Sequence, residues 1–222
     1  KIASLGDFIP DSDGLLDARG TLHLDSGWPR LGLEARGQDM RWQDVTVASL
    51  AISGDNRVNA GSDAFDVSLL ESRVGDIELD EIDARLTVGR ERQSLGLNAR
   101  AGQRTLTADL AGTLERNPAA TEASYWKGEL RAMELAANSQ DRVELNGPAP
   151  VFVSLERFGL ESACFSGTRG ASGCLEAAWS VSQGIEASAR INELSLDPVQ
   201  EFIGLGLSLS QQADGEISLS VP

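Results

Sequence analysis

Cys164 and Cys174 are the residues whose type and spacing most clearly permit chemistry in this chain. They are the only two cysteines, and the segment between them is rich in glycine and serine, which suits a disulfide that closes a hairpin or a short loop. Two buried free thiols are the alternative interpretation. A disulfide would indicate an oxidising compartment, because thiols in the cytosol are kept reduced.

Carboxylates suggest a second chemistry. Asp76, Glu78 and Asp80 stand two residues apart, so a strand would place their side chains on one face. Paired carboxylates are the groups that hydrolyse glycosidic bonds. The same row is also what the solvated face of a strand looks like, and charges protect sheet edges from aggregation. We favour the solvated face.

Metal binding and histidine chemistry find little support. The sequence Asp11-Ser12-Asp13-Gly14 is similar to the start of a calcium loop, but it lacks a third oxygen ligand before the glycine and a distal glutamate. We predict a solvated turn there, at the end of an irregular segment from Lys1 to Gly14. His23 is the sole histidine, and neither a catalytic triad nor a zinc site can be assembled around it. We therefore predict no enzyme, no catalytic residue, no metal and no cofactor.

Charge and hydropathy restrict the partners. The 222 residues carry a net charge of -15 and have a pI near 4.4, which argues against binding to nucleic acid or to an anionic membrane surface. No apolar run approaches the roughly 20 residues that a membrane-spanning helix needs. We expect any signal or membrane anchor to lie outside these residues.

Alternation of apolar and polar residues dominates the chain. In the segment from Ile185 to Asn192 every second residue is apolar, so a strand would have one apolar and one polar face. The same pattern recurs at 16–25, 31–35, 95–101, 106–114, 151–156 and 177–181. The sequence thus predicts an all-β fold in which each sheet must cover one face. Aromatic residues make up only 5% of the chain, so that face should be aliphatic.

Three local signals interrupt this pattern. Ile77 and Leu79 are out of phase with the apolar positions at 82–88, which predicts an extra residue and a bulge or corner near Asp80 and Glu81. A short helix is predicted from Asp197, a suitable N-cap, to Gly204, a suitable terminator. A polar linker at 117–118 divides a β-rich segment, 1–116, from a continuing one, 117–222, within one structural unit of a longer protein. Because the helix is too short to cover a sheet, the apolar faces must pack on strands or on something that is not protein.

One order of residues over about the last hundred positions resembles a known family. It consists of Trp126-x-Gly128-x-Leu130, Met133, Leu135, Val143-x-Leu145, Pro148-Ala149, Cys164-Phe165, Cys174-Leu175, Trp179, Gly184 and Leu194-Ser195-Leu196. In these residues the chain is similar to the TamB-type members of the AsmA-like, bridge-like lipid transport family. The first half of the chain resembles the family only in its general pattern and not in particular residues. The C-terminal region with which the family docks its partner is not recognisable.

The resemblance implies a periplasmic protein anchored in the inner membrane of a Gram-negative bacterium by a part outside this chain. It implies an elongated, curled sheet, folded like a taco, whose apolar trough carries phospholipid acyl chains between the two membranes. It also implies support of outer-membrane biogenesis with a TamA-like outer-membrane barrel, contacted through other parts of the full protein. Each buried methylene of an acyl chain would contribute about 0.8 kcal/mol, so no polar recognition site is required.

The trough interpretation and the period of two together predict which residues contact lipid. The predicted lining residues are Leu22, Leu24, Leu31, Leu33, Leu106, Ala108, Leu110, Val151, Val153, Ile185, Ala187, Ala189 and Ile191. The alternative is a closed β-sandwich or β-helix with a packed core, which would serve as a scaffold or adhesin-like module and would have no lipid conduit.

Overall fold

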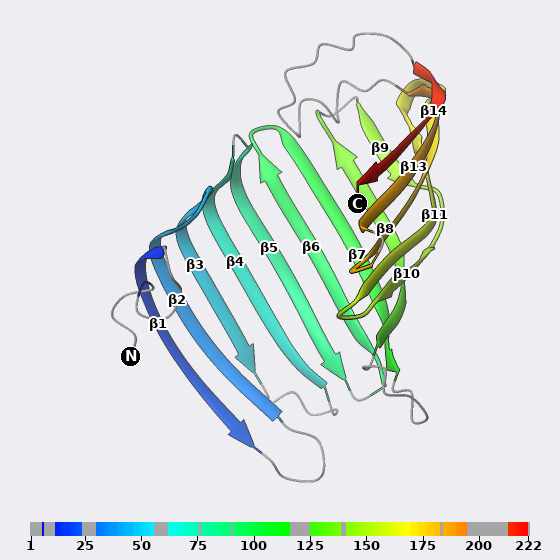
Figure 1. The fold of residues 1–222 in the computed structure, drawn as a ribbon. Helices are drawn as coiled ribbons and strands as arrows, with labels where there is room; N and C mark the ends of the chain where they lie inside the picture. The colour runs from blue at the N-terminus through cyan, green and yellow to red at the C-terminus, as the bar shows by residue number, and fades with distance from the viewer. Residues whose placement is uncertain are drawn as a thin grey trace. The chain divides into compact units, whose positions relative to one another are not determined.

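A computed structural model shows an antiparallel all-β protein, as the alternation predicts (Figure 1). It describes residues 6, 12–23, 30–55, 62–75, 77–89, 91–115, 125–138, 141–182, 184–194 and 213–221. The predicted helix at 197–204 and the predicted linker at 117–118 lie outside these residues. Within them, no helix has the length and apolar character that crossing a membrane would require.

The described strands fall into two compact units. The first unit comprises residues 1–90 and 94–105, and the second comprises 91–93 and 106–222. The strands of the first unit are β1 (Ser12–His23), β2 (Arg30–Trp42), β3 (Val45–Asp55), β4 (Ser62–Val74), β5 (Ile77–Gly89) and β6 (Gln93–Ala101). Those of the second are β7 (Arg104–Glu115), β8 (Tyr125–Ala136), β9 (Arg142–Leu145), β10 (Ala149–Val153), β11 (Arg157–Gly167), β12 (Ser172–Ser180), β13 (Gly184–Leu194) and β14 (Ala213–Val221).

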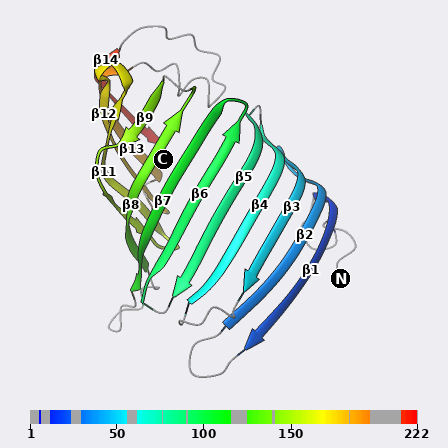
Figure 2. The same cartoon turned by 180° about the vertical axis from the view of Figure 1, so that it is seen from behind.

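The first unit is a single layer in which each strand pairs with the next (Figure 2). Directly opposed residues form rows across the strands, and one such row is Ala18, Ala35, Ile52, Val67 and Ala84. Opposed residues point to the same face. The register therefore collects the apolar positions of five strands on one face and the charged positions on the other.

The ladder of the first unit is interrupted along one row of four residues, Asp39, Ala48, Glu71 and Asp80. The pairings skip each of them, although the register on either side of the row is unchanged. Asp39 and Glu71 have φ values of 50° and 49°, which non-glycine residues rarely adopt. The apolar positions change phase at this row in all four strands.

The predicted extra residue near Asp80 and Glu81 is confirmed, because the pairing of β4 with β5 skips Asp80. The expected shift of register does not occur between β2, β3, β4 and β5, because each of them carries an extra residue in the same row. Among β1 to β5, the register shifts only between β1 and β2, where Gly14 alone stands against Asp39 and Met40. The prediction of an irregular segment up to Gly14 is wrong at its end, because β1 begins at Ser12.

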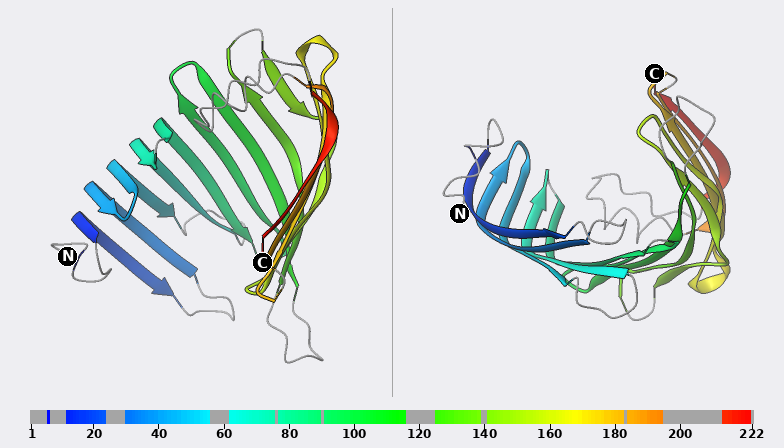
Figure 3. Two further views of the ribbon diagram at one scale, coloured as in Figure 1. Left: turned by 45° about the horizontal axis from the view of Figure 1, so that its top comes forward. Right: turned by 90° about the horizontal axis from the view of Figure 1, so that it is seen from below.

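The second unit has a branched pairing pattern. β8 pairs with both β9 and β10, β11 pairs with both of these, and β12, β13 and β14 continue the sheet from β11 (Figure 3). A bulge interrupts β11, where Glu161 and Ser162 together face one residue of β12. Ser162 has a φ of 42°, and its hydroxyl donates to Glu176 Oε1 at 2.8 Å. The bulge allows the apolar face of β11 to continue with a changed phase.

Candidate functional site

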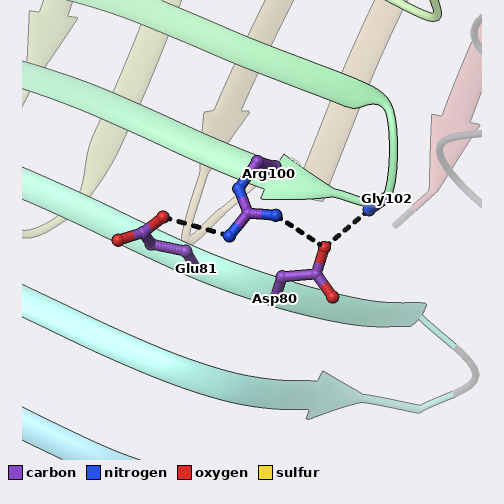
Figure 4. Close-up of polar contacts among 4 residues, drawn as sticks. All are labelled: Asp80, Glu81, Arg100 and Gly102. Atoms are coloured by element: carbon purple, nitrogen blue, oxygen red, sulfur yellow. Dashed lines mark hydrogen bonds and ion pairs between the residues drawn. The ribbon is translucent and has the colours of Figure 1, made fainter.

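The acidic row predicted from the sequence forms ion pairs in the first unit. Asp80 Oδ2 accepts from Arg100 Nη1 at 3.3 Å and from the backbone N–H of Gly102 at 2.7 Å, and Glu81 Oε2 accepts from Arg100 Nη2 at 3.3 Å (Figure 4). Glu78 pairs with Arg73, and Asp76 lies outside the described residues. These bonds hold β5 to β6 and fix the turn that follows β6. In the part of the chain that the structure describes, no three His, Cys, Asp or Glu side chains are grouped to hold a metal ion.

Cys164 and Cys174 form a disulfide, which confirms the prediction. They are directly opposed on β11 and β12, with their Cα atoms 3.9 Å apart. A 3-10 turn at Thr168–Gly170 connects the two strands, so the bond staples one hairpin. Arg190 of β13 is opposed to Cys174, which places the disulfide on the polar face of this sheet. The disulfide stabilises the sheet from the side opposite the apolar face.

The apolar face of the second unit is built from rows that cross several strands. One row consists of Trp126, Val153, Phe158, Trp179 and Ile185, on β8, β10, β11, β12 and β13 respectively. The next row consists of Gly128, Val151, Leu160, Ala177 and Ala187 on the same strands. Every member of both rows is uncharged and lacks a side-chain hydroxyl, carboxyl or amide group.

Two glycines provide the surface on which Trp126 lies. A Cβ atom at Gly112 would overlap the indole and the backbone of Lys127 and Gly128. A Cβ atom at Gly128 would overlap the indole and the carbonyl oxygen of Ala111. The large ring therefore packs flat over β7 and β8 because these positions have no side chain.

Burial varies strongly along this face. Leu130, Ala149, Val151 and Ala163 are buried and form a cluster that Ala108, Leu110, Met133, Leu145 and Phe165 contact from the side. Away from the cluster, Val153 is 40% exposed, Phe158 37%, Trp179 38% and Ile185 46%. No large side chain among the described residues is fully buried. The apolar face is therefore packed around the buried cluster and open along the row of Val153, Phe158, Trp179 and Ile185.

The first unit has an apolar face of the same kind. Leu50, Ile52, Val67, Leu69 and Ile82 are all half-buried on it. The buried residues among its described positions are small or polar, namely Ala35, Gly37, Asp63, Ser72, Gly89 and Ala99. A layer in which leucine and valine remain half-exposed has not completed a core of its own.

The predicted lining residues mostly fall on these two faces. Leu33 lies on β2 in the row of Gly54 and Phe65, and Leu22 is opposed to Leu31. Leu24 lies outside the described residues. In the second unit, Ala108 and Leu110 contact the buried cluster, and Leu106 is on the same strand and in the same phase. Val151, Val153, Ile185 and Ala187 belong to the two rows above, Ala189 is opposed to Leu175, and Ile191 is opposed to Gly173.

Sequence reasoning missed the contribution of β11. Phe158 and Leu160 lie on the apolar face on one side of the bulge, and Ala163 and Phe165 lie on it on the other. The signal was present, because these two pairs are out of phase by one residue across Glu161 and Ser162.

The polar face of the second unit holds a small aromatic group. The rings of Tyr125 and Phe152 are 5.2 Å apart, and the guanidinium of Arg157 lies 5.9 Å from the centre of the Phe152 ring. Tyr125 Oη donates to Glu115 Oε2 at 2.6 Å. This hydrogen bond, with some burial and the carboxylate charge, raises the pKa of Tyr125 above its usual value of 10.0. Beside the group is an open pocket of about 330 Å³, lined by Phe152, Arg157, Ala178 and Glu186 among others.

Comparison with known proteins gives one match that spans the chain. The sequence model of a family described as TamB, N-terminal domain, matches residues 1–221. Neither a curated protein sequence nor a solved structure matches.

Proposed function

We propose, from the premise that the chain belongs to the TamB N-terminal domain family, that it is a periplasmic segment whose apolar faces form a trough for phospholipid acyl chains. The observation that carries the proposal is the open apolar face. Phe158, Trp179 and Ile185 are opposed to one another on three strands, and each is more than a third exposed. Such a contiguous apolar surface marks a binding site for an apolar partner.

The chemistry of the face fits a hydrocarbon chain better than a ligand with polar groups. Both rows of the second unit lack hydrogen-bonding side chains apart from the indole N–H groups of Trp126 and Trp179. The first of these rows crosses five strands, four spacings of about 4.8 Å each. That distance exceeds the length of one acyl chain, which is about half of the roughly 30 Å hydrocarbon core of a bilayer.

The family and the disulfide support the proposed location. A bond between Cys164 and Cys174 requires an oxidising compartment such as the periplasm. We further propose that the protein transfers phospholipid between the inner and outer membranes and contributes to outer-membrane biogenesis with a TamA-like barrel. Contact with that barrel, and the membrane anchor, would belong to other parts of the full protein. We propose no enzymatic activity.

A closed scaffold is the second candidate, and the described side chains do not favour it. A closed sandwich would bury its large apolar side chains between two layers. Here the buried apolar residues among those described are mainly alanines, joined by Leu130 and Val151. Half-exposed leucine, valine and isoleucine are what a face that awaits an apolar ligand would show.

The test uses photo-crosslinking amino acids at successive positions of β13 in cells. We expect phospholipid adducts at Ala187 and Ala189, which lie on the apolar face, and none at Glu186 and Ser188, which lie on the other. Equal adducts on both faces, or no adducts anywhere, would contradict the trough.

Two neighbouring alanines of β12 offer a matched pair of variants. Ala177→Asp places a carboxylate on the apolar face, and Ala178→Asp places the same group on the exposed polar face. Because an acyl chain would have to desolvate the first carboxylate and not the second, we expect lipid adducts at Ala187 to fall only with Ala177→Asp. The variant must retain its disulfide and circular dichroism spectrum. Undiminished adducts in folded Ala177→Asp protein would refute the acyl-chain path.

A further inference from the structure

Two turns lie side by side at one end of the second unit. The turn between β10 and β11 contains Ser154, Leu155 and Glu156, and the turn after β12 begins at Val181. The Val181 N–H donates to the Glu156 carbonyl oxygen at 3.0 Å, which joins them. Leu155 is 83% exposed and Val181 is 70% exposed, the two highest values among the large apolar side chains of the described residues.

Hydrogen bonds fix the first of these turns in its outward position. The Ser154 N–H donates to the Arg157 carbonyl oxygen at 2.7 Å, and the Arg157 N–H donates to Ser154 Oγ at 2.9 Å. These bonds close the turn and direct Leu155 to solvent. Leu155 therefore packs little against the fold, and it indicates a partner only together with contiguous exposed apolar neighbours.

The turns continue the exposed apolar row described above. Val153 immediately precedes the first turn, Trp179 lies two residues before Val181, and Phe158 and Ile185 complete the row. We call the set Val153, Leu155, Phe158, Trp179, Val181 and Ile185 the apolar tip. Its charged neighbours in the turn are one acid and one base, Glu156 and Arg157.

The composition and size of the apolar tip favour a lipid bilayer over a protein. A stable protein interface takes roughly 20–30 residues from each side, whereas the tip offers six side chains. Shallow insertion into a membrane needs only a few apolar groups, and tryptophan is favoured at the membrane–water interface. The net charge of -15 opposes an anionic surface, so the suitable surface is one of zwitterionic lipid.

We propose that the apolar tip inserts into the interfacial layer of a zwitterionic lipid bilayer. Val153, Phe158, Trp179 and Ile185 also belong to the open face of the proposed trough. Leu155 and Val181, which lie in the turns beyond that row, are specific to the tip. Membrane insertion does not require a lipid conduit, so the test alters only these two residues.

Flotation with phosphatidylcholine vesicles tests the proposal on the 222-residue chain. We expect the chain to float with the vesicles, with little change between low and high salt, because the attraction is apolar. Leu155→Asp with Val181→Asp should lower the partition coefficient by roughly tenfold or more, since each change removes an inserted aliphatic side chain. The matched control, Leu15→Asp with Leu70→Asp, alters exposed leucines of the first unit and should leave flotation unchanged.

A gain-of-binding variant separates insertion from misfolding. Leu155→Trp should raise the partition coefficient in protein that retains the disulfide and the circular dichroism spectrum of the parent, because the indole is favoured at the membrane–water interface. Absence of flotation in the parent chain, or equal loss in the tip and control variants, would overturn the proposal. Self-association that depends on Leu155 and Val181, without vesicle binding, would overturn it in favour of a second copy of the chain.

Discussion

Removal of the disulfide should lower the free energy of unfolding by an amount that the structure allows us to calculate. Cys164 and Cys174 are ten residues apart in sequence. Closing a loop of that size restricts the unfolded chain by about 2.7 kcal/mol on the chain-entropy model, if the native geometry is unstrained. We therefore expect Cys164→Ser with Cys174→Ser to be less stable than the oxidised parent by about 2–3 kcal/mol.

Urea unfolding followed by circular dichroism measures this difference, after non-reducing peptide mapping has shown the bond to be complete in the parent. The matched control is Ser166→Ala with Ser172→Ala, the opposed pair two positions along the same hairpin and on the same face. We expect the control to change stability by no more than about 0.5 kcal/mol. Because this pair lies on the same two strands and the same face as the disulfide, it reports the effect of changing side chains there without breaking a covalent bond.

The lipid adducts provide a second readout. Because the disulfide lies on the polar face, its removal should leave adducts at Ala187 unchanged in protein that is still folded. A stability difference below about 0.5 kcal/mol between parent and disulfide variant would refute the calculation. It would mean that the hairpin remains closed in the unfolded chain without the bond.

Two further predictions concern packing and ionisation. Gly128→Ala should destabilise the chain by roughly 2 kcal/mol or more, because the new Cβ atom overlaps both the Trp126 indole and the backbone. The control Gly96→Ala, which has open space around it, should be neutral or slightly stabilising in thermal unfolding. Equal effects of the two variants would contradict the packing of Trp126 on glycine. The absorbance of the single tyrosine at high pH should titrate above pH 10 and return towards 10 in Glu115→Gln. Because the pKa of Tyr125 is higher in the folded than in the unfolded chain, the stabilisation that its hydrogen bond to Glu115 gives is complete below the unfolded pKa and is lost as the pH rises through the folded pKa. If Tyr125 of the unmodified chain titrated at or below pH 10, this hydrogen bond would be contradicted.

The sequence pattern was sufficient for the strands and their faces. Strict alternation from Ile185 to Asn192 predicted a strand that the structure shows within β13. It also placed Ile185 and Ala187 on one face, because the period of a strand is two and does not depend on its neighbours. The disulfide was predictable for a related reason, since two cysteines close in sequence, with flexible residues between them, meet readily across a hairpin.

Pairing and register were beyond what one sequence pattern contains. The phase change at Asp80 is visible in β5, but its meaning depends on whether the neighbouring strand changes phase at the opposed residue, as Glu71 does. The same signal across Glu161 and Ser162 is a true bulge, because β12 has no matching extra residue. The same change of phase along one strand thus gives either an extra residue that the neighbouring strand matches or an unmatched bulge. Only the sequence of the neighbouring strand distinguishes the two structures.

The open apolar face has a consequence for stability as well as for binding. Half-exposed residues such as Ile52 and Val67 in the first unit, or Phe158 and Ile185 in the second, have obtained only part of the hydrophobic stabilisation that a core would give them. The backbone ladders and the disulfide must therefore contribute more to holding the sheet. A ligand that covers the face supplies the missing burial, and any ligand that binds only the folded chain stabilises it according to its concentration and affinity. In the proposed trough, an acyl chain would act both as the cargo and as the second layer that the described strands do not provide for themselves.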